Sequence, residues 1–288
     1  MRWSRPLAVR VLARGMTFPL REMARAAQEM SAGDYRRRVT TSSRDEVGQL
    51  ADAFNRMAAE LAEVDRSRKE FVANASHELR TPVAALRSNL ENLVDRVVEP
   101  DAATLATMLA QAEHLSRLVT QLLDLSRLEA GAGPTPSELV AVGVLLKDVV
   151  AEAELLHPGS SLDLTTTGPL GVVGDEARLH QLFTNLIGNA LRFAPLGTEV
   201  EVEATGTGAE VVVEVRDRGP GIEPQHQARV FERFWQADGS APTGGGGAGL
   251  GLAICKRIVE RHEGSIAITT NRPTGACVAV TLPARPPT

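Results

Sequence analysis

The sequence predicts an α+β multidomain protein in which a dimeric helical bundle precedes an α/β sandwich. Three observations lead to this fold class. Apolar residues recur at helical spacing up to about residue 130, a Gly- and Pro-rich linker follows at 131–137, and short strand-like runs alternate with helices after it. The length of 288 residues is sufficient for two or three domains.

Composition and charge narrow the possible functions. The net charge of -5 gives no reason to expect a nucleic-acid partner. The two cysteines, Cys255 and Cys277, fit no metal or redox spacing, and we expect them to be buried thiols in a reducing compartment. No apolar run is long enough to cross a bilayer, and the basic segment 1–15 suits the inner edge of a membrane. We therefore expect a soluble chain from the cytoplasmic side of a membrane receptor whose sensor and transmembrane part is missing.

Residues 16–66 are expected to form two helices around an irregular connector. The first helix ends at Gly33-Asp34. The second begins after Asp45 and has an apolar seam of Val47, Leu50, Phe54, Met57, Leu61 and Val64. Neither helix can bury its stripe alone, so a parallel homodimeric four-helix bundle is predicted, with an ordinary helical hairpin as the alternative.

Residues 67–130 are expected to form an antiparallel hairpin that dimerises into another four-helix bundle. Its first helix is expected to bend at Pro82 and to end near Val98, with a seam of Leu79, Val83, Leu86, Leu90, Leu93 and Val97. On its second helix, one face carries Met108, Ala112, Leu115, Val119 and Leu122, widened by Leu118, Leu125 and Leu128.

A candidate nucleophile lies one position off the first of these seams. His77 is expected on the solvent side of the helix, and Glu78 follows it directly, so that the carboxylate can accept the imidazole proton. An isolated His-Glu pair of this kind is more often an ordinary part of an exposed helix surface, without a role in chemistry. The motifs further along the chain favour a catalytic role for His77 and Glu78.

Residues 138–284 are expected to form a mixed sheet with helices on one face. The predicted strands are Ser161–Thr167, Glu199–Ala204, Glu210–Val215, Ser265–Thr270 and Ala276–Leu282. The predicted helices are Gly143–Leu156, Asp175–Phe193 and Leu250–Arg261.

Two local patterns in this region point to a nucleotide and its metal. Asn185 and Asn189 lie one helical turn apart, and their carboxamide oxygens suit a magnesium ion that bridges phosphates; Arg192 can reach a phosphate oxygen. Asp217 ends a buried-looking strand and can accept a hydrogen bond from an adenine amino group, while Gly219 and Gly221 let the ligand approach. Each pattern is weak alone.

A third pattern is a glycine-rich loop that runs into an apolar helix. Its backbone N–H groups, at Gly247, Gly249, Leu250 and Gly251, can surround phosphates at a positive helix end. The aromatic segment 231–235 can pack as a lid over this loop, and Arg233 within it can touch the terminal phosphate. A flexible linker is the alternative.

Five motifs in this order resemble the H, N, G1, F and G2 boxes of bacterial two-component sensor histidine kinases. They are His-Glu-Leu-Arg-Thr-Pro, Asn-x-x-x-Asn, Asp-x-Gly-x-Gly, Phe-x-x-Phe and Gly-x-Gly-x-Gly. The resemblance covers about residues 60–283. Before it, residues 16–66 resemble a HAMP signal-relay module. The domains implied are this relay, a HisKA dimerisation and phosphotransfer hairpin at 67–130, and a HATPase_c ATP-binding domain of the GHKL type at 138–284. One departure is a longer glycine run than usual, with Ala248 inside it.

The resemblance implies an ATP-dependent protein-histidine kinase. Asn189, assisted by Asn185, would hold Mg²⁺ on ATP, and Asp217 would select adenine. His77 would attack the γ-phosphorus while Glu78 takes its proton, and the phosphoryl group would pass to an aspartate of a response regulator. Thr81, three residues after Glu78, fits the Glu-x-x-Thr pattern of kinases that also dephosphorylate their regulator.

Two alternatives remain open from the sequence. One is an ATPase or chaperone-like machine of the gyrase, Hsp90 and MutL superfamily, whose members carry a water-activating glutamate where this chain has Asn185. The other is a non-catalytic dimeric relay with a vestigial nucleotide domain.

Overall fold

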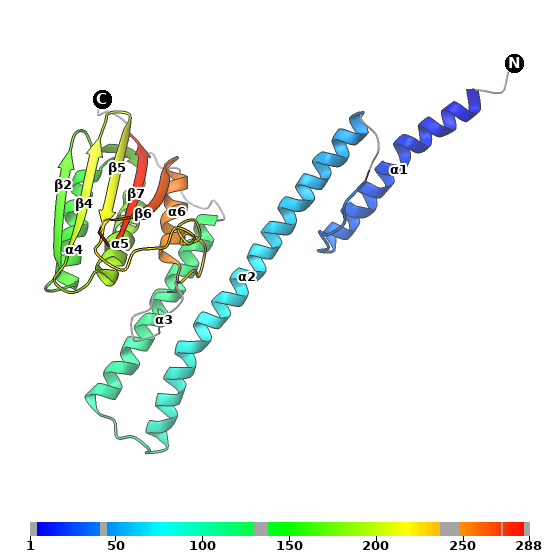
Figure 1. The fold of residues 1–288 in the computed structure, drawn as a ribbon. Helices are drawn as coiled ribbons and strands as arrows, with labels where there is room; N and C mark the ends of the chain where they lie inside the picture. The colour runs from blue at the N-terminus through cyan, green and yellow to red at the C-terminus, as the bar shows by residue number, and fades with distance from the viewer. Residues whose placement is uncertain (1–4, 41–44, 130–137, 237–247, 272, 285–288) are drawn as a thin grey trace. The chain divides into compact units, whose positions relative to one another are not determined.

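The computed structural model describes residues 5–40, 45–129, 138–236, 248–271 and 273–284. These form two compact units, Met1–His77 and Glu78–Thr288. Figure 1 shows helices in the N-terminal part and a sheet with further helices in the C-terminal part. The predicted linker at 131–137 lies outside the described residues. Within those ranges, no helix has both the length and the apolar character needed to span a bilayer.

The first unit pairs helix α1 (Arg5–Ser31) with the first part of helix α2 (Glu46–Val94). Its core is formed by Met23, Ala26, Val39 and Ala51. The Val39 backbone is fixed at both ends by Asn55 on α2, whose carboxamide accepts from the Val39 N–H at 2.9 Å and donates to its carbonyl at 2.8 Å. The described part of the irregular connector is therefore held against α2 by a side chain.

Helix α2 begins where the sequence predicted, but only part of its predicted apolar seam, including Val47 and Phe54, is covered within the single chain. Asp45 caps it by accepting the Val47 N–H at 3.0 Å. Val47, Ala51 and Ala58 are buried, whereas four residues of the predicted seam are exposed within the single chain: Leu50, Met57, Leu61 and Val64. Two of the three buried residues are alanines, and the four larger apolar residues remain uncovered within the single chain.

The C-terminal end of α2 lies earlier than predicted. The helix continues through Pro82 as one element and ends at Val94, not near Val98. Arg96 adopts a left-handed φ of 58°, and the Val97 N–H donates to the Asn92 carbonyl at 2.9 Å. This is the geometry of a Schellman cap, usually formed with glycine, so the apolar pattern alone did not reveal it.

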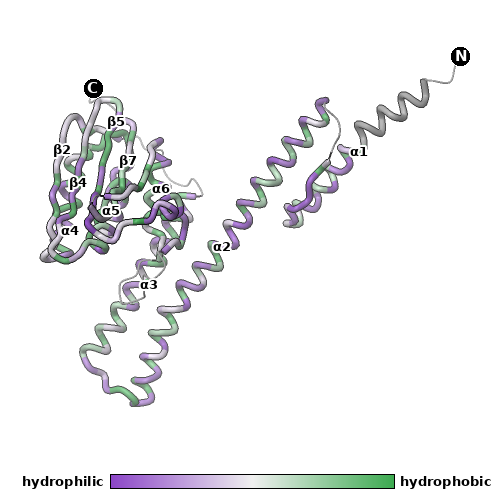
Figure 2. Tube along the Cα trace, in the orientation of Figure 1, coloured by the Kyte–Doolittle hydropathy of each residue, from purple (hydrophilic) through white to green (hydrophobic). Residues whose placement is uncertain are grey.

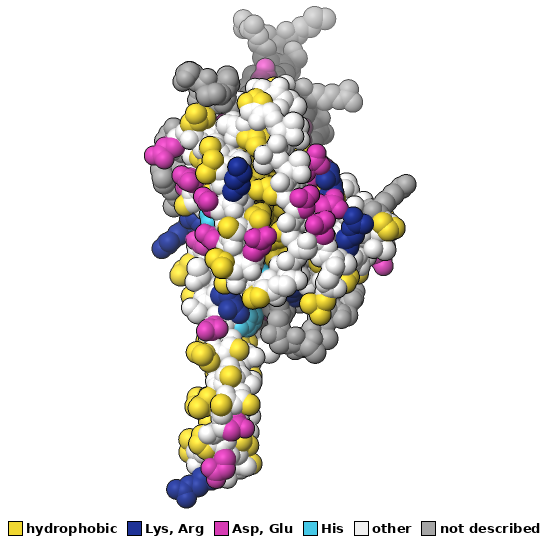
Figure 3. Space-filling model, turned by 90° about the vertical axis from the view of Figure 1, so that its left-hand side faces the viewer, with side chains coloured by type: hydrophobic (Ala, Val, Ile, Leu, Met, Phe, Trp, Pro, Cys, Tyr) yellow, Lys and Arg dark blue, Asp and Glu magenta, His cyan; other side chains and the backbone are white. Residues whose placement is uncertain are grey.

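Helix α3 (Ala102–Glu129) begins after Asp101, whose side chain accepts the Thr104 N–H at 2.7 Å. It packs against helix α6 (Gly251–Arg261). Its buried residues are Leu118, Leu125 and Leu128, the set expected only to widen the seam. Apolar and polar residues alternate along α2 and α3 (Figure 2), and apolar side chains remain exposed on the helical part of the chain (Figure 3).

The C-terminal domain contains a five-stranded mixed sheet in the order β2-β4-β5-β7-β6. Its strands are β2 (Ser161–Thr167), β4 (Glu199–Gly206), β5 (Glu210–Arg216), β6 (Ser265–Thr270) and β7 (Ala276–Pro283). β2 and β4 are parallel, and the other neighbouring pairs are antiparallel. A second small sheet, which the sequence analysis missed, pairs β1 (Glu138–Ala141) with β3 (Gly171–Gly174).

Helices α4 (Val142–Leu156), α5 (Glu176–Phe193) and α6 form the helical layer beside the sheet (Figure 1). The three predicted helices are thus confirmed to within one residue at each end. A buried histidine joins two of them: the His262 Nε2 accepts the Asp175 N–H at 3.0 Å, and its Nδ1 donates to the Ile258 carbonyl at 2.7 Å. Asp175 in turn caps α5, so the start of α5 and the end of α6 share one polar contact.

Candidate active site

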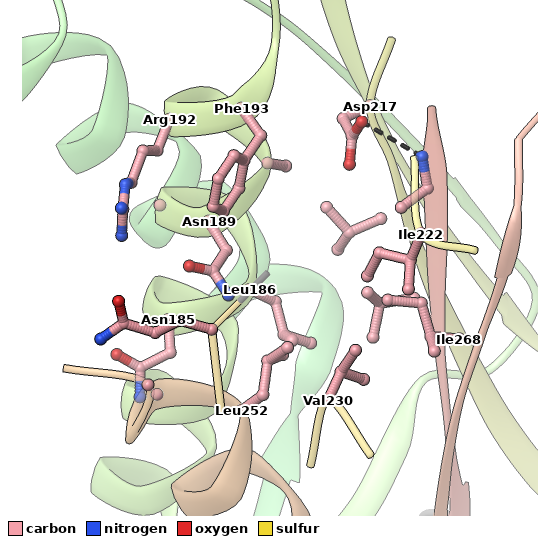
Figure 4. Close-up of a pocket in the computed structure, with 18 of the residues that line it drawn as sticks. Asn185, Leu186, Asn189, Arg192, Phe193, Asp217, Ile222, Val230, Leu252 and Ile268 are labelled. Carbon is pink, nitrogen blue, oxygen red and sulfur yellow. Dashed lines mark hydrogen bonds between the residues drawn. The ribbon is translucent and has the colours of Figure 1, made fainter. Parts of the chain in front are cut away.

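A cavity of about 520 Å³ lies between α5, α6 and the segment that follows β5. Its walls include the apolar side chains Leu186, Ile222, Val230, Leu252 and Ile268 (Figure 4). This volume and lining are typical of a small-molecule site. Of the predicted ligand-binding residues, the following line it: Asn185, Asn189, Arg192, Asp217, Gly221, Gly249 and Gly251.

Asp217 is a buried carboxylate with one oxygen fixed by the backbone. Its Oδ1 accepts the Gly219 N–H at 2.7 Å and the Ala276 N–H at 3.1 Å. The Asp217 carbonyl accepts from the Asn271 side chain at 2.8 Å. Among the described residues, no donor reaches Oδ2, and the residue lines the cavity. The second oxygen is therefore available to a ligand that donates a hydrogen bond.

The glycines after Asp217 are required by close backbone contacts. A Cβ at Gly219 would lie 2.6 Å from the Phe193 carbonyl oxygen at the end of α5. Gly221 has a φ of +75°, and a Cβ there would lie 2.8 Å from the Gly275 carbonyl oxygen. Gly221 lines the cavity, whereas Gly219 supports it from behind through its N–H to Asp217.

Asn185, Asn189 and Arg192 lie on α5, across the cavity from Asp217 (Figure 4). Their spacing of four and three residues places them on one face of the helix. The Arg192 guanidinium stacks on the Phe193 ring, with 4.9 Å between its carbon and the ring centroid. Two half-buried carboxamides on one wall of this cavity fit Mg²⁺ that keeps several waters. Among the described residues, no group of three or more His, Cys, Asp or Glu offers another metal site.

The described residues on either side of 237–247 are joined by one backbone contact. The Phe234 N–H donates to the Gly249 carbonyl at 2.9 Å. Gly249 has a φ of +68°, and a Cβ there would lie 2.6 Å from the Trp235 carbonyl oxygen. The aromatic segment and the helix that follows the loop therefore meet at the rim of the cavity. Gly247 lies outside the described residues.

Three of the described residues that were predicted to bind the ligand do not line the cavity: Gly219, discussed above, Leu250 and Arg233. Leu250 is completely buried as the N-cap of α6, so any ligand contact would come from its backbone. Arg233 lies beside a neighbouring hollow, and its guanidinium pairs with Glu129 of α3 at 2.5 Å. The Leu250 side chain therefore contributes to packing, and the Arg233 side chain forms an ion pair.

His77, Glu78 and Thr81 lie on α2 within little more than one helical turn. His77 and Thr81 are exposed, and Glu78 is partly buried. The position of His77 on the solvent side of the seam stays a prediction, because seam residues such as Val83 and Leu90 are also exposed in the single chain.

The cavity also contains residues that the sequence analysis missed. Arg117 and Gln121 of α3 line it, as does Ile222 after the aspartate motif. Helical spacing gave no sign that α3 would reach the cavity. Behind Asn185, the Cys255 thiol donates to the Leu182 carbonyl at 3.7 Å, and burial raises the pKa of this thiol to about 12. Cys255 is therefore a packing residue, as expected, and not a nucleophile.

Comparisons with known protein families cover most of the chain. Residues 174–286 match the histidine kinase-, DNA gyrase B-, and HSP90-like ATPase family. Residues 67–131 match the His Kinase A (phospho-acceptor) domain, and residues 11–63 match the HAMP domain.

Several curated proteins are similar over nearly all of the chain. The signal transduction histidine-protein kinase BaeS of Escherichia coli (strain K12) is 36% identical over 280 residues, which are 96% of this chain and 60% of BaeS. The sensor-like histidine kinase SenX3 of Mycolicibacterium smegmatis is 34% identical over 85% of this chain and 67% of SenX3. The kinase/phosphatase MprB of Mycolicibacterium vanbaalenii is 35% identical over 97% of this chain and 60% of MprB. The chain thus spans about 60% of the length of BaeS and MprB.

Solved structures of similar proteins agree with the fold. The histidine kinase AdeS of Acinetobacter baumannii aligns with a TM-score of 0.61 and 26% identity, covering 73% of this chain and 98% of that structure. Full-length ShkA in complex with AMPPNP aligns with a TM-score of 0.52 and 30% identity, covering 76% of this chain and 47% of ShkA. With its sequence motifs in order and its relatives alike over both helical and sheet regions, the chain belongs to the two-component sensor histidine kinases.

Proposed function

We propose that this chain is an ATP-dependent protein-histidine kinase that phosphorylates His77 and passes the phosphoryl group to a response regulator. The observation that carries the proposal is the cavity. A buried carboxylate, Asp217, has one oxygen fixed and one available, and it faces Asn185, Asn189 and Arg192 across an apolar space. This arrangement separates an adenine end from a phosphate end.

At the adenine end, the available Asp217 oxygen would accept a hydrogen bond from the exocyclic amino group, and the apolar walls would cover the base. At the phosphate end, Asn189 and Asn185 would hold Mg²⁺, which supplies charge neutralisation to the triphosphate. Arg192 would contact a phosphate oxygen, and the N–H groups at Gly249, Leu250 and Gly251 would add donors at the start of α6. Gly247 and Arg233 are assigned to the same end by their sequence motifs.

The transfer step needs a nucleophile and an acceptor for its proton. An imidazole nitrogen of His77 would attack the γ-phosphorus, forming an N–P bond as the bond to the bridging oxygen breaks and ADP leaves. Glu78 would accept the ring proton. The phosphoryl group would then move to an aspartate carboxylate on the regulator, which restores neutral His77.

A hydrolase is the rival reading within the same superfamily. Asn185 stands where those ATPases carry the glutamate that activates water, and a carboxamide cannot act as a general base. Transfer to a protein side chain is therefore favoured over hydrolysis. The complete set of Asp217, Asn189 and the glycine loop argues against a relay without catalysis.

We further propose that the chain forms a homodimer, acts on a response regulator and lies at a membrane. The exposed stripe Leu50, Met57, Leu61 and Val64, with Val83 and Leu90 further along α2, supports a parallel homodimer. The phosphohistidine requires a response regulator with a reactive aspartate. The HAMP-type segment and the basic residues before it support a place on the cytoplasmic side of a membrane receptor.

We also propose a second activity, removal of phosphate from the regulator. Thr81 lies one turn after His77 on the exposed side of α2, where its hydroxyl can position a water beside a docked phospho-aspartate. The similar MprB carries both activities in its name.

The test is incubation of the full chain with γ-labelled ATP and Mg²⁺, followed by acid treatment, since phosphohistidine is acid-labile. His77→Gln should abolish the label and leave ATP binding intact. The matched variant His114→Gln changes a histidine of α3 and should label normally. Label that persists in His77→Gln, or that is lost in His114→Gln, would contradict the assignment. Sustained ATP turnover without labelled protein would favour the hydrolase.

A further inference from the structure

One face of α3 is aligned with the nucleotide cavity. Arg117, Gln121 and Asp124 follow one another at steps of four and three residues, so they form a stripe on one side of the helix. Beside this stripe lie the buried residues Leu118 and Leu125. The helix packs against α6, which begins at the rim of the cavity. α3 therefore presents both a buried apolar face and a polar stripe to the C-terminal domain.

The polar stripe is fixed at Asp124. Its Oδ1 accepts from the Arg178 guanidinium at 3.2 Å, and its Oδ2 accepts from the Gln181 side chain at 2.9 Å. Arg178 also donates to the Gln181 side-chain oxygen at 2.8 Å, which closes a three-residue network. The side chains of Arg178 and Asp124 are only 28% and 18% exposed, so the ion pair is shielded from solvent. A second ion pair joins Glu129 to Arg233.

The same face of α5 leads from this network to the asparagines. Arg178, Gln181 and Asn185 are spaced by three and four residues, so the α3 contact and the predicted metal ligands share one stripe. Seven residues before Asp124, about 10 Å along α3, Arg117 lines the cavity together with Asn185 and Asn189. Arg117 is exposed, which leaves its guanidinium room to turn towards a bound phosphate.

We propose that α3 completes the nucleotide site, with Arg117 as a positioning residue for the phosphates of ATP and the Asp124 network as the contact that holds it there. The inference rests on the proposed function of the cavity. Arg117 would add a phosphate contact from the helical hairpin to the contacts that the C-terminal domain supplies. Nucleotide affinity would then depend on the packing of α3 against that domain. Because ATP binding and this packing are coupled, ATP in turn stabilises the packed position of α3.

The test measures nucleotide affinity of the full chain by calorimetry, in a His77→Gln background so that label transfer does not consume ATP. Adenosine, ADP and ATP are titrated at constant Mg²⁺. Arg117→Gln should weaken ATP binding by about threefold to tenfold, as expected for one exposed contact to a charged group, weaken ADP less, and leave adenosine unchanged. Arg117→Lys should retain most of the affinity, and Arg127→Gln, an exposed arginine of α3 outside the cavity lining, should bind like the parent.

Asp124→Asn tests the contact that holds α3 against α5. It should reproduce the loss seen in Arg117→Gln, and the double variant should be no weaker than either single variant, since both act through the same contact. Thermal unfolding checks that the variants remain folded. Equal effects on adenosine and ATP, no effect of Arg117→Gln, or additive losses in the double variant would overturn the inference. Failure of the parent chain to bind ATP would instead contradict the proposed function.

Discussion

Replacing Asp217 by asparagine separates its role in the fold from its proposed role in recognition. The asparagine side chain keeps an oxygen that can accept both the Gly219 and the Ala276 N–H. Each bond changes from charge-assisted to neutral, a loss of about 1 kcal/mol per bond that is partly offset because no buried charge needs to be desolvated. The free energy of unfolding should therefore fall by no more than about 2 kcal/mol.

The change at the other side-chain atom is larger for the ligand. An N–H₂ group replaces Oδ2 and faces the adenine amino group, so that two donors meet. Loss of a hydrogen bond to a charged acceptor costs about 1.5–3 kcal/mol, which corresponds to an ATP affinity weaker by roughly tenfold to a hundredfold. Guanine carries an acceptor where adenine carries its amino group, so the preference for ATP over GTP should also fall.

Calorimetric titration with ATP and GTP, beside thermal unfolding of the same samples, measures both effects. Asp163→Asn, on exposed β2 outside the cavity, is the matched control. Asn189→Ala gives the complementary signature, because it should remove the Mg²⁺ dependence of binding and keep the base preference. An Asp217→Asn chain that retains full ATP affinity, or that loses ATP and GTP equally in proportion to its stability, would refute the adenine contact.

Two further predictions concern residues away from the adenine end. Thr81→Ala should leave labelling of His77 nearly normal and slow dephosphorylation of the regulator, because its hydroxyl is not needed for attack by the imidazole; equal loss of both rates would contradict this. Cys255, whose pKa burial raises from 9.0 to about 12, should react with thiol reagents only after unfolding. Since its folded pKa is the higher one, its contribution to stability is complete below pH 9 and is lost as the pH rises from 9 towards 12. Cys255→Ser should flatten that part of the stability curve measured by thermal unfolding, and an unchanged curve would show that other groups cause it.

Periodicity predicted the longer helices and strands of the C-terminal domain. β2 and β6 have the predicted bounds, and α5 begins at the predicted Asp175 cap. β1 and β3 were missed because four-residue strands are too short to show an alternation. In α3, the pattern identified the apolar residues correctly, but α6 covers the face of Leu118 and Leu125 that was expected to be secondary. Spacing shows which residues share a face and not which element covers it.

The candidate site was predictable where its chemistry is local in sequence. Asn185 with Asn189, and Asp217 with Gly221, are short motifs that reach the cavity as expected. Arg117 was not predictable, because its approach to the cavity depends on how α3 packs against the C-terminal domain. No pattern within α3 contains that information.

Gly275 shows how a local motif depends on a distant residue. It has a φ of +121°, and a Cβ there would lie 1.9 Å from the Asp217 carbonyl oxygen. The same glycine carbonyl limits the space at Gly221, and the next N–H, that of Ala276, holds the Asp217 side chain. The Asp-x-Gly-x-Gly motif therefore works only because a glycine in the β6–β7 turn lets the two backbones touch. A substitution at Gly275 would displace the carboxylate without changing any residue of the motif, so the adenine end of the site is determined by two chain segments, of which the sequence motif marks one.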